Sequence, residues 1–169
     1  MQWRTLPILQ GKLHPGHPDD LQVIVHDGGP RITRARPEAV WATITGFDGA
    51  VFTGKVLNAP TQLASVRQHQ AIRFVVDAGS GHAVMVTDKY LGERPRWNVG
   101  GCAQCGFAHL FDAPSDLIRA TFSGLPPGAT PEAFTAFCPL CGGVQAIEHV
   151  DIDDEPAAGP AKKPWWKVW

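Results

Sequence analysis

Four cysteines are the residues of this chain whose type and spacing specify chemistry most clearly. They form two pairs, Cys102 with Cys105 and Cys138 with Cys141. Each pair leaves two residues between its thiolates, a spacing that lets both sulfurs face one ion. A glycine follows the second cysteine of each pair, and its conformational freedom lets nearby backbone amides turn toward sulfur. Together the two pairs predict one tetrahedral metal site with four thiolate ligands.

Zinc (Zn2+) is the metal that this donor set favours, although iron accepts the same four thiolates. Because four protein ligands leave no open position for an activated water, we expect the metal to stabilise the fold and not to catalyse. The long insert between Cys105 and Cys138 predicts a loop or hairpin that projects from the site. The alternative interpretations are four buried apolar cysteines or a redox-active pair, and a redox pair would need only one of the two motifs.

No other group of residues in the sequence predicts catalysis. His14 and His17 lie in a proline-rich segment and are either ligands of a second metal or ordinary surface histidines. No serine, cysteine or lysine stands in a nucleophile motif, and the glycines at residues 79–81 lack the pattern that completes a phosphate-binding loop. The His-x-Glu motif of zinc deaminases is absent as well. We therefore expect a protein that is not an enzyme.

Aromatic and basic residues gather in the last part of the sequence. Three of the six tryptophans, Trp165, Trp166 and Trp169, flank Lys167. We predict that these four residues bind a protein partner, with the indoles as anchors. Two alternatives are peripheral contact with a membrane interface, where tryptophan and lysine both settle, and packing of this segment against the body of the protein.

The charge of the chain bears on the class of partner. A formal net charge of −1 removes the general attraction to phosphate that most nucleic-acid-binding proteins show, so nucleic acid is not the expected partner. Arg31, Arg34 and Arg36 nevertheless form a local basic cluster. With Arg94 and Arg96 this cluster is either an anion-binding surface or a solvated face.

Composition and length indicate a β-rich protein of modest size. The 169 residues, 44% of them hydrophobic, suffice for one domain and a smaller metal-stapled unit. The 18 glycines and 15 prolines favour turns and short strands over long helices. No apolar run has the length of a signal peptide or of a membrane span, which predicts a cytoplasmic protein with reduced cysteines.

Alternating apolar and polar residues predict several short strands. The expected strands are residues 21–25, 39–45, 50–57, 71–77 and 82–87. The second and third of these make a hairpin with its turn at residues 46–49, and the last two pair as another hairpin. Residues 61–69 are a loop or a helical turn, residues 88–97 are a connector, and residues 131–137 are a helical turn.

The expected organisation has three parts. A β-rich domain occupies residues 1–95, a zinc ribbon occupies residues 96–150, and a flexible linker with the tryptophan-rich tail occupies residues 151–169, where the composition becomes acidic and then rich in proline and alanine. The predicted fold class is α+β with mainly antiparallel β structure.

The first predicted hairpin resembles a group of small bacterial domains. Residues 40–49 match a tryptophan-bearing strand and an acidic-Gly turn, and residues 54–60 match a strand end of the form Gly-x-Leu-Leu-Asn-x-Pro. Residues 68–76 resemble the segment that follows in those domains. Some members of the group are immunity proteins of bacterial polymorphic toxin systems, so the resemblance of residues 41–76 implies neutralisation of a toxin by binding. The cysteine ribbon and the tail are additions to that pattern.

These observations lead to a hypothesis of binding. We expect a non-enzymatic bacterial binding protein with a structural zinc site, of the immunity type, whose partner is a protein such as a cognate toxin. The alternative is a nucleic-acid-associated zinc-ribbon factor, because such ribbons often present basic and aromatic residues to polynucleotides.

Overall fold

The structure is a computed structural model that describes residues 2–151. The predicted linker therefore lies almost wholly outside the described residues. The predicted partner-binding residues Trp165, Trp166, Lys167 and Trp169 lie outside them as well.

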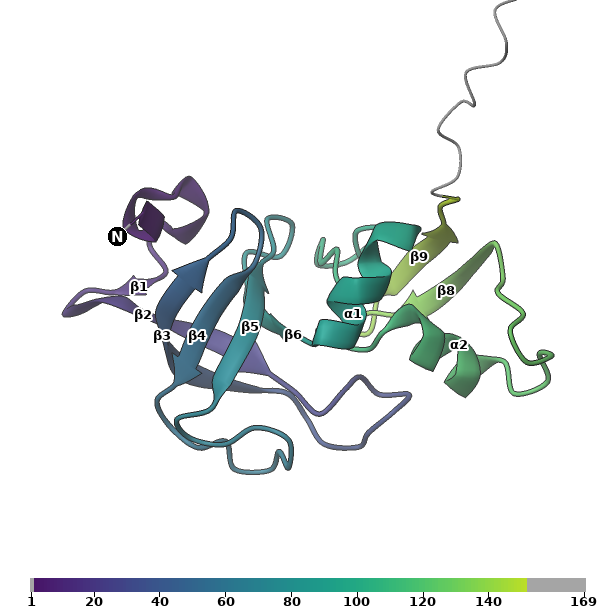
Figure 1. The fold of residues 1–169 in the computed structure, drawn as a ribbon, viewed down its shortest axis with the longest axis horizontal. Helices are drawn as coiled ribbons and strands as arrows, with labels where there is room; N and C mark the ends of the chain where they lie inside the picture. Colours follow the sequence, from purple (N-terminus) through teal and green to yellow (C-terminus); the bar gives the residue numbers. More distant parts are fainter. Residues whose placement is uncertain (1, 152–169) are drawn as a thin grey trace, which may run out of the picture.

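Six strands make the larger of two sheets, and five of them close into a barrel (Figure 1). The strands are β1 (Leu13–His14), β2 (His17–Val25), β3 (Glu38–Phe47), β4 (Phe52–Val56), β5 (Ala71–Val76) and β6 (Ala83–Val86). Each strand pairs antiparallel with the next, and β2 also pairs in parallel with β6 through Ile24 and Val84. This last pairing closes the barrel from β2 to β6 and leaves β1 attached on the outside of β2.

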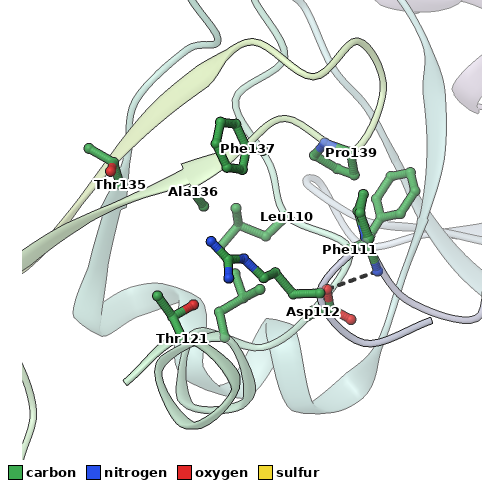
Figure 2. Close-up of a pocket in the computed structure, with 12 residues that line it drawn as sticks. Leu110, Phe111, Asp112, Thr121, Thr135, Ala136, Phe137 and Pro139 are labelled. Atoms are coloured by element: carbon green, nitrogen blue, oxygen red, sulfur yellow. Dashed lines mark hydrogen bonds between the residues drawn. The ribbon is translucent and has the colours of Figure 1, made fainter. Parts of the chain in front are cut away.

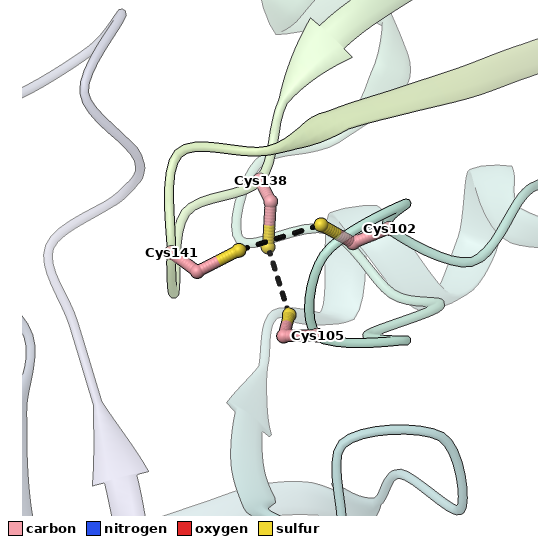
Figure 3. Close-up of side chains that lie close together, drawn as sticks. All are labelled: Cys102, Cys105, Cys138 and Cys141. Carbon is pink, nitrogen blue, oxygen red and sulfur yellow. Dashed lines mark hydrogen bonds between the residues drawn. The ribbon is translucent and has the colours of Figure 1, made fainter.

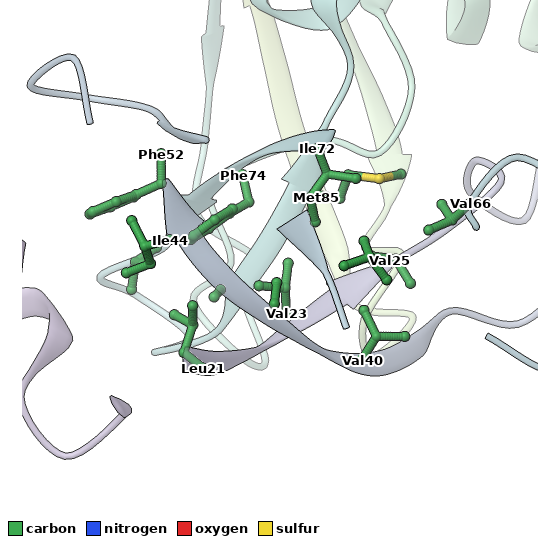
Figure 4. Packing of buried hydrophobic residues seen from close by; sticks show 14 of the residues in the cluster. Leu21, Val23, Val25, Val40, Ile44, Phe52, Val66, Ile72, Phe74 and Met85 are labelled. Atoms are coloured by element: carbon green, nitrogen blue, oxygen red, sulfur yellow. The ribbon is translucent and has the colours of Figure 1, made fainter. Parts of the chain in front are cut away.

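Apolar residues that alternate along the strands fill the barrel. In β4, Phe52, Gly54 and Val56 are buried and the two residues between them are exposed. Phe52 stacks on Phe47 and on Phe74, with ring centroids 4.4 and 5.2 Å apart. The other strands contribute Leu21, Val23, Val40, Ile44, Ile72 and Met85, which point into the same interior (Figure 4). The barrel therefore has a continuous hydrophobic core.

The two predicted hairpins are confirmed. β3 and β4 pair antiparallel, and the Asp48 carboxylate accepts hydrogen bonds from the amides of Ala50 (3.2 Å) and Val51 (2.8 Å) in the turn between them. β5 and β6 also pair antiparallel. The strand expected at residues 21–25 begins earlier, at His17, where it pairs with His14 across a tight turn.

The cysteine-bearing part contains a second sheet and two α-helices. The antiparallel strands β7 (Trp97–Val99), β8 (Ala133–Phe137) and β9 (Val144–His149) lie in the order β7-β9-β8. The helices are α1 (Asp88–Glu93) and α2 (Pro114–Thr121), and short 3-10 helices span Gln2–Thr5, Pro7–Leu9 and Arg94–Arg96. Tyr90 of α1, Leu117 and Ile118 of α2, and Phe134 and Ile147 of the sheet share one buried cluster. The predicted fold class, mainly antiparallel β, is confirmed.

Two local predictions are wrong. Residues 131–137, predicted as a helical turn, contain β8, because this segment pairs with β9 and its Phe134 ring packs 5.6 Å from that of Trp97. Residues 88–97, predicted as a connector, contain α1, because the Thr87 hydroxyl caps the helix by accepting a hydrogen bond from the Tyr90 amide (3.1 Å). No helix among residues 2–151 combines the length and the apolarity needed to cross a membrane.

Candidate metal centre

The four predicted ligands come from two turns at one end of the second sheet. Cys102 and Cys105 lie in the segment that follows β7, and Cys138 and Cys141 lie in the turn between β8 and β9. Because β9 pairs antiparallel with both β7 and β8, the two turns reach the same end of the sheet. Figure 3 shows the four sulfur atoms pointing toward one another.

The sulfur atoms are spaced as metal ligands would be. All four Sγ atoms lie within 4.8 Å of one another, with 3.4 Å between Cys102 and Cys141 and 3.6 Å between Cys105 and Cys138. Four sulfurs placed tetrahedrally at about 2.3 Å from one zinc ion would lie about 3.8 Å apart. A disulfide needs about 2.05 Å between sulfurs, and all four thiols are free. The structure thus brings the predicted ligands together in a candidate metal site.

The two turns share the same backbone design. In each turn the amide of the glycine after the second cysteine donates a hydrogen bond to the carbonyl oxygen of the first, from Gly106 to Cys102 (2.9 Å) and from Gly142 to Cys138 (2.8 Å). Amides also donate to sulfur, that of Gln104 to Cys102 Sγ and that of Gly143 to Cys141 Sγ (3.4 Å each). The glycine after the second cysteine has a φ of 78° in the first turn and 80° in the second. A residue with a Cβ is strained at such φ values. The predicted role of these glycines, to let amides turn toward sulfur, agrees with this geometry.

The surroundings make the four thiols unequal. Hydrogen bonds lower the pKa of Cys102 to about 6, the strongest coming from the Cys105 amide. Burial raises the pKa of Cys138 to about 12, and burial also raises that of Cys105. Because a metal binds the thiolate form, its binding would release protons from the thiols of high pKa. Affinity for a metal is therefore expected to increase with pH.

The cysteine cluster packs directly against the barrel. Cys102 and Cys138 are buried in one apolar cluster with Phe111 and Val84, and Ile24 packs against this cluster. Ile24 and Val84 are the pair whose parallel contact closes the barrel. The candidate metal site therefore lies on the closing seam of the barrel.

Close backbone contacts fix this junction. A Cβ at Gly79, in the turn between β5 and β6, would lie 2.0 Å from the carbonyl oxygen of Gly106, so that only glycine fits there. The neighbouring Asp77 is 3% exposed, and its carboxylate accepts hydrogen bonds from the amides of Ser80 (2.6 Å) and Ala108 (3.1 Å). These contacts hold the first cysteine turn on the barrel.

His14 and His17 do not join a larger ligand set. Their rings are neighbours across the β1–β2 turn, with centroids 5.1 Å apart. The four cysteines are the single group of three or more potential ligands found within residues 2–151. The second metal considered for these histidines thus has no further ligand in the described part of the chain.

The arginines of the predicted basic surface lie in different elements. Arg31, Arg34 and Arg36 are exposed in the loop between β2 and β3, and none of them pairs with an acidic side chain of the described residues. Arg94 instead uses its guanidinium to donate a hydrogen bond to the Trp97 carbonyl oxygen at the start of β7. Arg96 is exposed, like the three loop arginines, so Arg94 is the member of this set that a contact of the described residues engages.

His26 is a buried residue of the junction that sequence reasoning did not single out. Its Nδ1 accepts a hydrogen bond from the Gly28 amide (3.1 Å), and its Nε2 donates one to the Met85 carbonyl oxygen (2.9 Å). Its ring stacks on Phe111 at 3.9 Å between centroids. Burial lowers its pKa to about 4, so the imidazole is neutral. No local pattern identifies His26, because its partners are distant in the sequence.

A groove lies between β8, α2 and the β2–β3 loop (Figure 2). Its volume is about 150 Å³, and its apolar lining comprises Leu110, Phe111, Leu117, Ala136, Phe137 and Pro139. Arg31 and Asp112 also line it. The Asp112 carboxylate accepts a hydrogen bond from the Gly29 amide (2.9 Å), and burial raises its pKa. The groove is thus apolar with charged residues beside it.

Exposed apolar side chains continue the surface of this groove. Phe137 and Val144 face each other across β8 and β9 and are 59% and 50% exposed. Ile32, in the loop that borders the groove, is 48% exposed. Apolar residues gathered in this way, rather than scattered singly, are typical of binding surfaces.

Comparison of the chain with models of known families, with curated proteins and with solved structures finds no match in any of the three. The resemblance of residues 41–76 to immunity domains consequently stays a prediction from sequence. What the structure itself establishes is a β-rich fold with a clustered set of four cysteines.

Proposed function

We propose that this chain is a protein-binding module whose latter half is organised by one structural zinc ion. The observation that carries the proposal is the four-cysteine cluster on the barrel seam. Four thiolates complete the tetrahedral coordination of zinc and leave no position for a substrate or an activated water. The ion would hold the two cysteine turns to each other and to the barrel.

The surface around the cluster supports the role in binding. The groove and the exposed pair Phe137 and Val144 lie on elements that neighbour the β2–β3 loop. The arginines of that loop pair with no acidic side chain of the described residues. Apolar residues bordered by charged ones are typical of protein interaction sites. A binding protein also needs no open metal position, which agrees with the closed ligand set.

Among protein-binding functions we favour neutralisation of a toxin, because residues 41–76 resemble bacterial immunity domains. In this proposal the partner is a protein, and Trp165, Trp166, Lys167 and Trp169 add anchors to the contact surface. Neutralisation by binding is stoichiometric, so it requires a stable complex and no turnover.

Metal analysis tests the zinc assignment. Full-length protein from cells supplied with zinc and iron should carry one zinc ion per chain, and exchange for Co2+ should give the spectrum of a four-thiolate tetrahedral site. Cys141→Ser should lose this spectrum, whereas Ala103→Ser, in the other cysteine turn but not a ligand, should keep it. Bound iron, or no bound metal, would contradict the assignment.

Co-expression tests the binding function. The full-length protein is expressed with each protein encoded beside it, in a host that such a protein poisons. We expect restored growth and a complex that survives size-exclusion chromatography. Failure to protect against every neighbouring toxin would contradict the immunity function, and failure of the metal-loaded chain to form any protein complex would contradict protein binding altogether.

A nucleic-acid-associated factor is the second candidate, favoured by the three exposed arginines of the β2–β3 loop. The net charge of −1 argues against it. Filter binding of single-stranded and duplex DNA and RNA over a range of salt concentrations distinguishes the two functions. Affinity that falls steeply with salt and is lost in Arg31→Glu would favour nucleic acid.

A further inference from the structure

A free sheet edge runs along the groove. β8 pairs with β9 and with no other strand of the described residues. At one end of this pairing the Cys138 amide donates a hydrogen bond to the Gly143 carbonyl oxygen (2.6 Å), so the even-numbered residues of β8 bond to β9. Ala133, Thr135 and Phe137 consequently turn their backbone N–H and C=O groups away from β9. Within residues 2–151 no hydrogen bond is made at this outer edge.

The groove lies directly beside this edge. Thr135 and Phe137 line one side of it, and Thr121 of α2 lies across from them (Figure 2). Leu117 of α2 belongs to the lining as well. In an extended peptide paired with β8, alternate side chains would point to opposite faces, one set into the groove and the other over Phe137. An apolar cavity of about 150 Å³ holds a group of the size of benzene, so the groove has room for one apolar side chain.

The charged residues beside the groove indicate which side chains a bound peptide should carry. Arg31 lines the groove, and Arg34 and Arg36 line a depression that adjoins it along the same loop. All three are exposed and form no ion pair with the described residues. The nearest carboxylate in the lining, Asp112, is already bonded to the Gly29 amide. Carboxylates of an incoming segment would therefore find arginines ready for charge-assisted hydrogen bonds.

We propose that an extended, acidic and apolar segment of a partner protein adds to the outer edge of β8, with one apolar side chain in the groove and carboxylates against the loop arginines. Main-chain hydrogen bonds would supply affinity, and the groove and arginines would supply specificity. This inference rests on the proposed protein-binding function and assigns its surface. It also explains why Phe137 is exposed, since the added strand would cover it.

A synthetic peptide tests this surface on the full-length protein. The probe is a short fluorescein-labelled peptide with one isoleucine flanked on both sides by consecutive aspartates, and its binding is followed by fluorescence anisotropy. We expect saturable binding. The same peptide with lysine in place of aspartate, and the same peptide with alternate backbone nitrogens methylated, should each bind about tenfold more weakly, because one loses the charge pairing and the other the main-chain donors.

Substitutions on the protein provide the second half of the test. Thr135→Pro removes an outward N–H and leaves the bonds to β9 in place, whereas Thr135→Val keeps that N–H. Arg31→Glu reverses a charge of the groove, and Arg67→Glu reverses an exposed charge in the loop between β4 and β5, which lines neither the groove nor the adjoining depression. We expect Thr135→Pro and Arg31→Glu each to weaken probe binding about tenfold, and the two controls to change it less than about twofold. Unchanged metal content shows that each variant is folded.

Several outcomes would overturn the inference. Equal probe binding by the wild type, Thr135→Pro and Arg31→Glu is one of them. Self-association that Thr135→Pro abolishes would assign the edge to a second copy of the chain. Tighter probe binding after joint replacement of Trp165, Trp166 and Trp169 by alanine would assign it to the chain's own last residues. Salt-sensitive nucleic-acid binding that is lost in Arg31→Glu would assign the arginines to a polynucleotide.

The proposed function and this inference fail in different ways. A natural protein partner that binds the wild type and Thr135→Pro equally would remove the β8 edge from the interface and leave the protein-binding function intact. Absence of any protein partner for the metal-loaded full-length chain would remove the function itself.

Discussion

The barrel and the cysteine-bearing sheet reach stability by different routes. The barrel closes on itself through the pairing of β2 with β6, and apolar side chains from all of its strands fill it. Within residues 2–151 the second sheet has three short strands and an open edge at β8, and it gathers four thiols at one end. A closed barrel is stabilised mainly by burial of apolar surface, whereas a small sheet commonly needs a metal or a disulfide. We therefore expect the two regions to respond differently to loss of the metal.

The two regions are not fully independent, because they share an apolar cluster where they meet. Ile24 and Val84 belong to the barrel, yet they pack with Cys102 and Cys138. Loss of the metal would thus loosen the seam as well as the second sheet. The balance between these two effects can be measured.

Removal of one ligand should produce the largest effect. We expect Cys105→Ser to destabilise the second sheet by several kcal/mol, because metal binding is coupled to its folding. Limited proteolysis should then cut within residues 97–150 and spare the β3–β4 hairpin, while Ala103→Ser resists like the wild type. A metal-free variant that stays fully resistant would remove the contrast between the two regions.

A cavity in the barrel should destabilise the barrel and leave the second sheet and its metal site intact. Phe74 is fully buried between strands, so Phe74→Ala should lower the free energy of unfolding by about 3–5 kcal/mol. Urea denaturation followed by metal analysis should show the barrel unfolding at lower urea with the zinc still bound before the transition. Thr53→Ala, on the exposed face of β4, serves as the control. Release of the metal ahead of barrel unfolding would show that the two regions are not separable.

His26 should make the junction sensitive to pH. Its pKa is about 4 in the folded protein and about 6.5 when unfolded, so between these values the unfolded chain binds a proton that the folded chain does not. The free energy of unfolding should therefore be fully maintained above pH 6.5 and fall by up to about 3 kcal/mol as the pH drops toward 4. In His26→Gln this loss should be absent. Because the wild type and His26→Gln have the same thiols, the difference between their free energies of unfolding reports on His26 alone. A difference that does not change with pH would refute the role of His26.

A single methyl group at the junction should give the smallest effect of the four. Gly79→Ala would drive a Cβ into the Gly106 carbonyl and should cost about 1–3 kcal/mol. Hydrogen exchange should accelerate on both sides of the contact, in the β5–β6 turn and near Cys105. Gly92→Ala, where nothing lies within 4 Å, should leave exchange unchanged. Acceleration on one side alone would mean that the contact does not couple the regions.

The features that sequence reasoning predicted are those encoded locally. The cysteine turns are recognisable because two residues separate the thiols and a glycine follows them, and all four ligands meet as expected. The β3–β4 hairpin is recognisable from the alternation of Val40, Ala42 and Ile44 and from the Asp-Gly turn. In both cases the determining interactions span only a few residues.

The features that were missed depend on distant partners. Pairing of Ile24 with Val84 closes the barrel, and neither residue differs in type from other core residues. β8 is a strand because β9 bonds to it, although the sequence of residues 131–137 predicts a helical turn. The groove is assembled from the β2–β3 loop, α2 and β8, so no continuous stretch of sequence signals it.

The position of the metal site on the seam has a consequence for the nascent chain. All barrel strands precede Cys102, while Cys138 and Cys141 follow only after a long insert. Because amino-terminal units fold first during translation, the barrel is ready before the ribosome has delivered the second pair of thiols. Cys102 and Cys105 therefore lie beside an already folded barrel before the other two thiols of the metal site have been synthesised. If the proposed metal binds there, its delivery is a late step in the biogenesis of this protein, and premature oxidation of Cys102 and Cys105 would block it.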